Sequence, residues 1–269
     1  METLPKISII TVVRNGENDI ENTIKSIISQ TYTNVEYIII DGKSTDGTVD
    51  IIKKYQHHLS YWISEKDKGI YDAMNKGVIA STGDWLLFIN SDDSLASDDV
   101  LQKAVKYLQE CTDKIAYGNI IYVYPGEKEV EYGPAWESTK YRFRNVAMSL
   151  AHQATFHSKA LFTERHFDTS FKIAGDYDFL LSHLKDHEAT YFPVTIAKMK
   201  TGGLSYSVSK IELLRDTRKA QIQNKMYNSI PSIAWIVSAT KLLLVDFIIR
   251  NVGVDGKNTL KKWLGIRKR

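Results

Sequence analysis

Two adjacent carboxylates, Asp92 and Asp93, follow a run of apolar residues in the segment LLFINSDD, residues 86–93. Apolar runs of this length favour a buried strand, so we expect both aspartates at its carboxyl end. In open α/β sheets, ligands bind outside those ends. Two neighbouring carboxylates repel each other unless a cation is present, and oxygen ligands suit Mg²⁺ or Mn²⁺ holding a nucleotide's phosphates. The alternative interpretation is a turn made by serine and aspartate.

Two more carboxylates, Asp41 and Asp72, lie at the end of a predicted strand and at the start of a predicted helix. Asp41 follows the run 35–40 and opens the segment DGKSTDGT. It is placed to accept hydrogen bonds from a nucleobase imide or from ribose hydroxyls, and its alternative role is a helix N-cap, for which Asp46 is better placed. Asp72, in GIYDAMNKG, lies at the start of a predicted helix, where the helix dipole alone favours a carboxylate.

A second acidic cluster, AGDYDFLL, places Asp176 and Asp178 on either side of a tyrosine. Residues two apart on a helix point in different directions, so one carboxylate can face a cleft while the other caps the helix or faces solvent. A carboxylate held near a sugar hydroxyl can act as its general base. His152 and His157, in AHQATFHS, are candidate contacts to an acceptor or a diphosphate, and hydrogen-bonded structural histidines are the alternative.

These residues are carried by alternating strands and amphipathic helices, which predict βαβ units and a parallel sheet in the first half. We expect strands at 7–13, 35–40, 59–63 and in the run ending at Asp92, and helices at 19–29, 49–55 and 71–80. Beyond residue 112 the pattern changes, and we expect strands at 115–124, 129–132 and 190–198 and helices at 176–184 and 209–227. The segment 136–149 has no clear pattern.

The composition is that of an ordinary globular protein, with 43% hydrophobic and 25% charged residues in a chain of 269. A net charge of +3 is too small to indicate a nucleic-acid partner. The single cysteine, Cys111, excludes an intrachain disulfide and suits a reducing compartment. Because no signal peptide is evident, we expect a cytoplasmic protein.

The most apolar window spans residues 231–249 and precedes a basic tail. Lys241 and Asp246 lie inside it, and each would cost roughly 2.5–3.5 kcal/mol near a bilayer centre, which argues against a transmembrane helix. Two interpretations stay open: the helix lies on the anionic inner face of a membrane, or it docks on the protein's own core.

Five blocks in order resemble the family 2 glycosyltransferases with the GT-A fold: TVVRN, SIISQTY, EYIIIDGKSTDGT, SEKDKGIYDAMNKG and STGDWLLFINSDD. The likeness is close over residues 5–95 and weaker to about residue 205. It implies an α/β fold with a Rossmann-like, mostly parallel central sheet flanked by helices and a helical C-terminal appendage. The implied division is a GT-A domain at 1–205, with a nucleotide-sugar half at 1–112 and an acceptor half at 113–205, followed by a helical, basic segment at 206–269.

The resemblance also implies roles for single residues. The donor side comprises Thr11 and Asp41 at the nucleotide base, Asp72 beside them, Asp92 near the ribose or sugar, and Asp93 as ligand of a Mn or Mg ion. Asp176 would be the general base, at the aspartate of the family's ED motif. Gly175 replaces the glutamate of that motif, so Asp178 stays open as an alternative base or, like His152, as an acceptor or diphosphate contact.

The leading hypothesis is therefore a metal-dependent, inverting hexosyltransferase that uses a nucleotide diphosphate sugar, with UDP favoured. A glycan or lipid-linked glycan acceptor would place it in bacterial surface polysaccharide synthesis, such as O-antigen or capsule, peripheral to the inner face of the cytoplasmic membrane. The alternatives are a non-catalytic sugar-nucleotide binder or assembly partner and a nucleotidyltransferase. The latter needs a loop rich in glycine and arginine after the first strand, where VVRNGEND offers only Arg14 and Gly16.

Overall fold

The computed structural model describes residues 4–202, 208–227 and 230–263, with side chains as far as residue 248. Strands and helices alternate in the first half, as predicted: β1 (Ile7–Val13), α1 (Ile20–Ile28), β2 (Val35–Asp41), α2 (Thr48–Lys54), η1 (Gln56–His58), β3 (Tyr61–Ser64), α3 (Ile70–Ala80), β4 (Trp85–Phe88), β5 (Ser94–Leu95) and α4 (Val100–Leu108). The second half contains β6 (Ile115–Tyr124), β7 (Lys128–Tyr132), α5 (Trp136–Asn145), η2 (His152–Ala154), β8 (Thr155–Ser158), α6 (Leu161–Glu164), α7 (Gly175–Leu184), β9 (Thr190–Lys200), α9 (Lys210–Gln223) and α10 (Ile233–Trp263).

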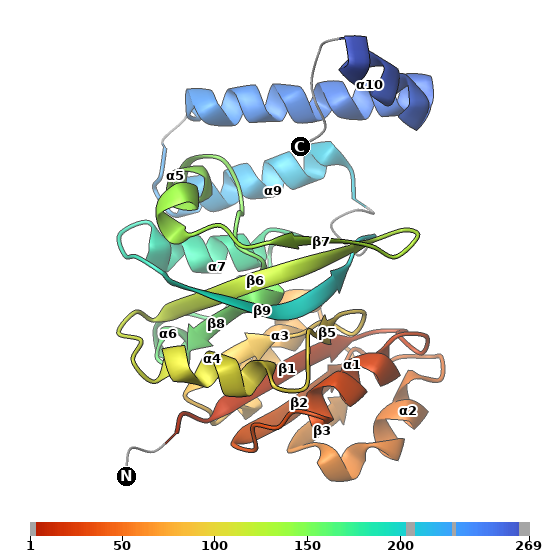
Figure 1. The fold of residues 1–269 in the computed structure, drawn as a ribbon, viewed down its shortest axis with the longest axis vertical. Helices are drawn as coiled ribbons and strands as arrows, with labels where there is room; N and C mark the ends of the chain where they lie inside the picture. The colour runs from red at the N-terminus through yellow and green to blue at the C-terminus, as the bar shows by residue number, and fades with distance from the viewer. Residues whose placement is uncertain (1–3, 203–207, 228–229, 264–269) are drawn as a thin grey trace.

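The described strands form one sheet in the order β3-β2-β1-β4-β8-β6-β9-β5, with β7 paired to β6 (Figure 1). The first four are all parallel, because a helix crosses between successive strands of this half. Beyond β4 the sheet is mixed: β8 runs antiparallel to β4 and β6, whereas β6 and β9 are parallel. The predicted α/β class is confirmed.

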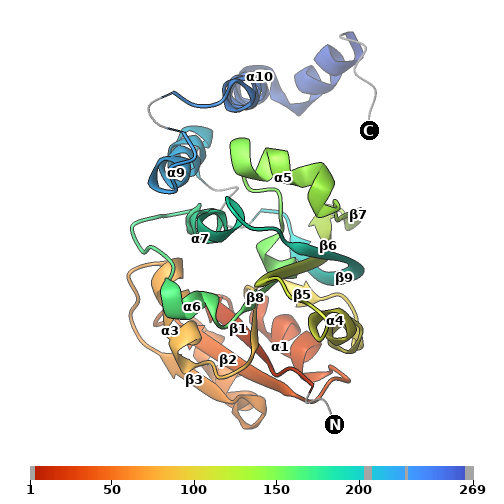
Figure 2. The same ribbon diagram turned by 90° about the vertical axis from the view of Figure 1, so that its left-hand side faces the viewer.

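Each face of the sheet carries its own hydrophobic cluster, because side chains alternate along the strands. Ile9 and Leu87 face the cluster formed with α1, α2 and α4, whereas Ile10 and Phe88 face the cluster formed with α3, α5, α6 and α7. Figure 2 shows α1 and α4 on one side of the sheet and α3 and α6 on the other. The two covered faces leave the ends of the strands as the place for a ligand.

Strand β4 is shorter than predicted, since it ends at Phe88 rather than at Asp92. The N–H of Ile89 still donates to the carbonyl of Ile10, at 3.1 Å, but the chain then turns, with a 3.1 Å hydrogen bond from Asp93 N to Asn90 O. Asparagine, serine and aspartate favour turns over strands. The two aspartates therefore lie in a turn beyond the strand, so both predicted features, the strand and the turn, occur in succession.

The C-terminal helices α9 and α10 lie beyond α7, at the end of the molecule remote from β1, β2 and β3 (Figures 1 and 2). Helix α9 begins with a capping box in which Ser209 Oγ accepts from Glu212 N at 3.1 Å. No helix among the described residues has the length and hydropathy that a membrane span requires. The last basic residues of the predicted tail, Arg267, Lys268 and Arg269, lie outside the described residues.

Candidate active site

The loops after the parallel strands meet at one edge of the sheet. Val13 at the end of β1 pairs with Asp41 at the end of β2, and Asp41 pairs with Ser64 at the end of β3. Strand β4 flanks β1 on its other side, so the turn at 90–93 opens on the same edge. Helix α3 also begins here because it follows β3. The sequence-based expectation that strand ends bring these polar residues together is met for this edge.

Asp41 is fully buried where β2 ends. Its Oδ2 accepts hydrogen bonds from Ser44 N at 3.0 Å and Ser64 Oγ at 2.5 Å, and Ser44 Oγ donates to its Oδ1. The carboxylate thus ties together the loops after β2 and β3. Asp46 rather than Asp41 serves the next helix, since its Oδ1 accepts from Thr48 N at 3.1 Å. The Asp41 carboxylate thus already accepts three hydrogen bonds from within the protein.

Thr11 does not offer its side chain to a ligand. The residue is fully buried in β1, and its Oγ1 accepts a 3.1 Å hydrogen bond from Tyr37 on the neighbouring strand. The predicted contact between Thr11 and a nucleotide base stays a prediction, which the side chain does not support. The alternation of β1 points the side chain into the core, which leaves only the backbone near the edge of the sheet.

The turn that carries the paired aspartates is fixed from α1. Thr23 Oγ1 lies 2.9 Å from the carbonyl oxygen of Ser91 and 2.6 Å from that of Asp93. Because Thr23 is itself buried, its hydroxyl is a rigid anchor for the turn. Helix α1 thus positions both acidic side chains without touching either carboxylate.

Asp93 is only 3% exposed, and both its carboxylate oxygens are engaged. Gln153 Nε2 donates to Oδ2 at 2.8 Å, and the backbone N–H of Lys200, at the end of β9, donates to Oδ1 at 3.2 Å. Burial, with the neighbouring charge of Asp92 adding to it, raises the pKa of Asp93 to about 7. Asp93 therefore joins β9 and η2 to the turn.

Asp92 is the more accessible of the pair, being only partly buried. In the described part of the chain, its carboxylate accepts no hydrogen bond from another residue. Lys200 Nζ lies near it in an ion pair with Asp19. Burial first, and then the charge of Asp19, raise the pKa of Asp92, while Lys200 opposes this rise. Of the two aspartates, Asp92 has the oxygens that are free to bind something else.

His152 is a packing residue, which corrects its assignment as an acceptor or diphosphate contact. Its ring stacks on Phe88 with centroids 4.9 Å apart, and its Nε2 has no hydrogen-bond partner among the described residues. Burial lowers its pKa to about 4, so the ring is neutral at ordinary pH. His157 is likewise fully buried. The next residue, Gln153, is the one in this segment that reaches the acidic turn.

Asp176 lies in the first turn of α7 and is held against α3. The hydroxyl of Tyr71 donates to the carbonyl of Ile173 and lies 3.3 Å from Asp176 Oδ1, which also accepts from Tyr177 N at 2.8 Å. Burial raises the pKa of Asp176 to about 6, although these hydrogen bonds oppose it. Because Tyr71 stands in the first turn of α3, the contact brings Asp176 to the same edge of the sheet as Asp41.

The same tyrosine explains why position 175 is glycine. A Cβ built on Gly175 would lie 2.7 Å from two carbon atoms of the Tyr71 ring and 2.8 Å from a third. The ring therefore fills the space that a side chain at 175 would need. Tyr71 and Gly175 form a matched pair, which accounts for the departure from the family's ED motif.

Asp178, the alternative to Asp176, makes its contacts toward α9. It is fully buried, pairs with Arg165, and accepts from Asn224 Nδ2 of α9 at 2.8 Å. Burial raises its pKa, and the Arg165 charge opposes the rise. These contacts join α7 to α9.

The contacts of Asp72 lie at the start of its own helix, α3. Its Oδ2 accepts from Lys68 N at 3.0 Å, one turn before, and lies 3.7 Å from Lys76 Nζ, one turn after. This is the first-turn role that the helix dipole favours. Its predicted support of the nucleotide pocket is therefore indirect, through the loop before α3.

Sequence reasoning missed three residues of the site: Tyr71, Gln153 and Asp67. Asp67 covers Gly42, since a Cβ there would lie 2.3 Å from Asp67 Oδ2, and so it stands beside Asp41. Its position after the third strand was the available signal. Gln153 and Tyr71 had no such signal, because a glutamine before a strand and a tyrosine on a helix are ordinary.

Comparison with known proteins settles the family. The model of glycosyl transferase family 2 matches residues 8–169, more than half of the chain. The chain belongs to this family. As a family 2 glycosyltransferase it is 30% identical over 219 residues to a PGL/p-HBAD biosynthesis glycosyltransferase of Mycobacterium bovis (strain BCG / Pasteur 1173P2), covering 78% of this chain and 83% of that protein. It is 29% identical over 232 residues to an uncharacterized glycosyltransferase of Mycobacterium tuberculosis (strain ATCC 25618 / H37Rv), covering 84% and 87%.

Solved structures confirm the GT-A fold of this glycosyltransferase. S. aureus TarS 1-349 in complex with UDP superposes with a TM-score of 0.64 at 18% identity, covering 84% of this chain and 67% of that one. The mannosyltransferase PcManGT from Pyrobaculum calidifontis, in complex with GDP-Man and Mn²⁺, gives 0.65 at 15% identity, covering 98% and 81%. At such identities the likeness establishes the fold.

The pairing of Gly175 with Tyr71 gives a first prediction for this family 2 enzyme. Gly175→Ala should lower the free energy of unfolding by about 1–3 kcal/mol, the usual cost of overpacking a filled site. In a Tyr71→Ala background the ring is gone, so the same substitution should cost much less. Urea unfolding of the four proteins of this double-mutant cycle measures the coupling. Additive effects of the two substitutions would contradict the steric account.

Proposed function

We propose that this family 2 glycosyltransferase moves a sugar from a UDP-sugar to a hydroxyl of a glycan or lipid-linked glycan, with inversion at the anomeric carbon. In the reaction the acceptor oxygen attacks that carbon and its proton passes to Asp176. The bond from the carbon to the diphosphate oxygen breaks, and its electron pair leaves with the diphosphate. In the proposed division, residues 1–112 hold the donor and residues 113–205 hold the acceptor.

The observation that carries the proposal is the environment of Asp176. A general base works best when its pKa lies near the operating pH, and burial lifts the pKa of this carboxyl to about 6. The Tyr71 hydroxyl and the Tyr177 N–H fix its orientation without neutralising it. One carboxylate suffices for an inverting transfer, because the diphosphate is a good leaving group.

The paired aspartates fit a divalent cation. Burial, and after it the charge of Asp92, raises the pKa of Asp93, and a bound cation would relieve the repulsion between the two carboxylates. We propose Asp92 as the direct ligand in place of the earlier choice, Asp93, because the oxygens of Asp93 already accept hydrogen bonds from Gln153 and Lys200. Among the described residues no three His, Cys, Asp or Glu side chains form a metal cluster. Mg²⁺ and Mn²⁺ commonly use one or two carboxylates plus substrate phosphates, and such an ion would offset charge on the departing diphosphate.

The donor class is supported by what the structural relatives hold. TarS was solved with UDP and with UDP-GlcNAc, and PcManGT with GDP-Man and Mn²⁺. Asp41 and its neighbour Asp67 stand at the edge of the sheet where a base would lie. A uracil imide N–H could replace one of the serine donors to Asp41. Surface polysaccharide synthesis at the inner face of the cytoplasmic membrane is the proposed setting.

Calorimetric titration with UDP, GDP and dTDP, each with and without Mn²⁺, tests the donor part of this proposal. We expect UDP to bind most tightly and to need the metal, because the carboxylate pair repels a diphosphate when no cation is present. Preference for GDP would overturn the choice of base. Equal binding with and without Mn²⁺ would overturn the metal role while leaving the family assignment intact.

A further inference from the structure

Helix α10 carries an apolar stripe that the protein leaves uncovered. Its exposed large apolar residues recur three or four positions apart, which places them on one face of the helix: Ile233, Ile236, Val237, Leu243, Leu244 and Phe247. Phe247 is 64% exposed and Val237 is 62% exposed. Of the two interpretations of this window, docking on the protein's own core accounts only for the opposite side.

The position of α10 is fixed at its start, so the stripe has a defined direction. Ser232 Oγ donates to the carbonyl of Asn145, at the end of α5, at 2.8 Å, and accepts from Trp235 N at 3.0 Å. Ala239, one turn further on, is buried. The helix therefore rests on the rest of the chain and presents its apolar side outward.

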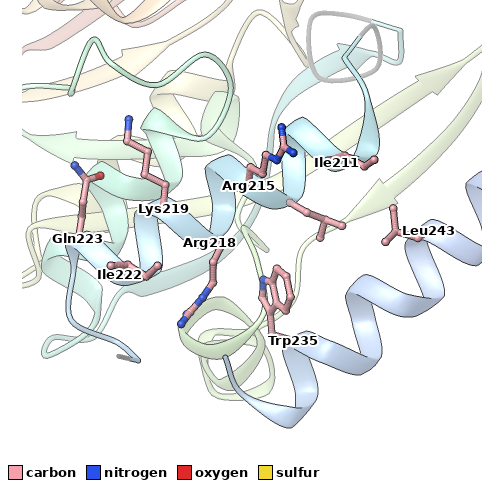
Figure 3. Close-up of a pocket in the computed structure, with 9 residues that line it drawn as sticks. Ile211, Arg215, Arg218, Lys219, Ile222, Gln223, Trp235 and Leu243 are labelled. Carbon is pink, nitrogen blue, oxygen red and sulfur yellow. The ribbon is translucent and has the colours of Figure 1, made fainter. Parts of the chain in front are cut away.

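A groove of about 500 Å³ runs between α9 and α10. Ile211, Leu214 and Ile222 of α9 and Leu243 of α10 give it apolar walls, and Arg215, Arg218 and Lys219 also line it (Figure 3). Trp235 projects from the first turns of α10 into the same space. Its buried Nε1–H has no hydrogen-bond partner among the described residues, although indole N–H groups ordinarily find one. The groove thus combines apolar walls with cations, which suits a hydrocarbon chain with an anionic head.

The positive charge of the chain is concentrated in the segment that contains α9 and α10. Residues 209–269 contain 13 lysines and arginines against 4 aspartates and glutamates, a net charge of +9. Residues 1–208 contain 22 lysines and arginines against 28 aspartates and glutamates, a net charge of −6. The overall charge of +3 therefore conceals a basic C-terminal segment on an acidic body. Such a segment is attracted to an anionic surface, while the acidic body is repelled from it.

We propose that the α9–α10 face is the surface on which the protein docks on an anionic lipid bilayer. The stripe of α10 enters the boundary between head groups and hydrocarbon, as interfacial amphipathic helices do. The groove receives one lipid chain, with its phosphate at the cations that line it, Arg215 among them. This inference deepens the proposed function, on which it rests for its purpose: it brings the donor site to acceptors held in a membrane.

Co-sedimentation with vesicles tests the docking surface directly. The full chain should bind vesicles of phosphatidylcholine and phosphatidylglycerol, bind phosphatidylcholine alone much less, and release as salt rises. Val237→Asp/Phe247→Asp should lower the vesicle partition coefficient by about tenfold or more, and Arg215→Glu by roughly tenfold. The matched controls are Ile79→Asp/Val130→Asp, two exposed apolar residues elsewhere, and Lys106→Glu on α4. These controls make the same changes of charge and should bind as wild type does.

Two results would overturn the docking surface. One is equal vesicle binding by wild type and by Val237→Asp/Phe247→Asp. The other is a wild-type dimer in lipid-free solution that the same variant converts to monomer, with no vesicle binding, because a second copy would then cover the stripe. UDP titration without vesicles is run on every variant. Lost vesicle binding with intact UDP binding isolates the surface, and the reverse pattern would fault the proposed function alone.

Discussion

Asp176→Asn should lower kcat by about 10²–10⁴-fold, the usual contribution of a positioned general base, while donor binding stays unchanged. The amide keeps the shape of the side chain but cannot take the acceptor's proton. Steady-state transfer rates and UDP titration measure the two effects separately. An unchanged kcat would remove Asp176 from the reaction and leave the base unassigned.

The pH dependence of the wild type adds an independent check. Because the pKa of Asp176 is raised to about 6, kcat should fall about tenfold for each pH unit below 6 and level off above it. The residual activity of the asparagine variant should lack this step.

The free energy of unfolding should change with pH in the opposite direction to kcat. Between the ordinary pKa near 3.8 and about 6, the unfolded carboxyl is ionised and the folded one is protonated, so wild-type stability falls as pH rises, and the loss persists above 6. The variant should therefore be at least as stable as wild type at pH 8.

Asp178→Asn is the matched control on the same helix turn. Its carboxylate pairs with Arg165 and accepts from Asn224, so its loss should lower the free energy of unfolding by about 2 kcal/mol. At a temperature where the variant is folded, kcat should stay within a few-fold of wild type. A large loss of kcat with unchanged stability would return Asp178 to the role of base.

The fold could be predicted far into the chain because its first half obeys simple periodicities. Strands such as Val35–Asp41 are mostly apolar, and helices such as Ile20–Ile28 repeat isoleucine at helical spacing. The predicted end of strand β4 lay too far along the chain. Ile89 continues the apolar run, and the residue at which the strand stops depends on the turn that begins at Asn90. The helix at 136–145 was not predicted because its polar residues outnumber its apolar ones and only Trp136, Thr139 and Phe143 are buried.

The sequence indicated the carboxylates of the candidate site but not the residues that contact them. The pair at 92 and 93 is conspicuous because it follows an apolar run, and Asp176 because it belongs to an acidic cluster that precedes one. Which oxygens are free depends on contacts between segments far apart in sequence. Gln153 reaches Asp93 across 60 positions, and Tyr71 reaches Asp176 across 105. No local pattern encodes such contacts, so the proposed exchange of roles between Asp92 and Asp93 rests on the structure.

Asp92→Asn should remove the effect of Mn²⁺ on nucleotide binding. In the wild type we expect Mn²⁺ to raise UDP affinity strongly; in the variant the affinity should be weak and nearly the same with and without the metal. Asp93→Asn should weaken metal binding only about tenfold and keep the dependence on Mn²⁺, because its carboxylate supports the turn through Gln153 and Lys200. Titration of all three proteins with UDP, with and without Mn²⁺, gives the comparison.

The pH dependence of Mn²⁺ affinity shows whether the charge of Asp93 supports metal binding or whether its side chain only holds the turn together. Its pKa is raised to about 7, chiefly by burial, and a bound cation favours its ionised form. Mn²⁺ binding should therefore release a proton below pH 7, and affinity should rise up to tenfold per pH unit until it levels off above 7. Asp93→Asn should flatten this rise, whereas Lys106→Glu, a charge change on the surface of α4, should leave it intact. If Asp93→Asn abolishes Mn²⁺ dependence and Asp92→Asn retains it, Asp93 is the direct ligand and the hydrogen bonds that now occupy its oxygens must open when the metal binds.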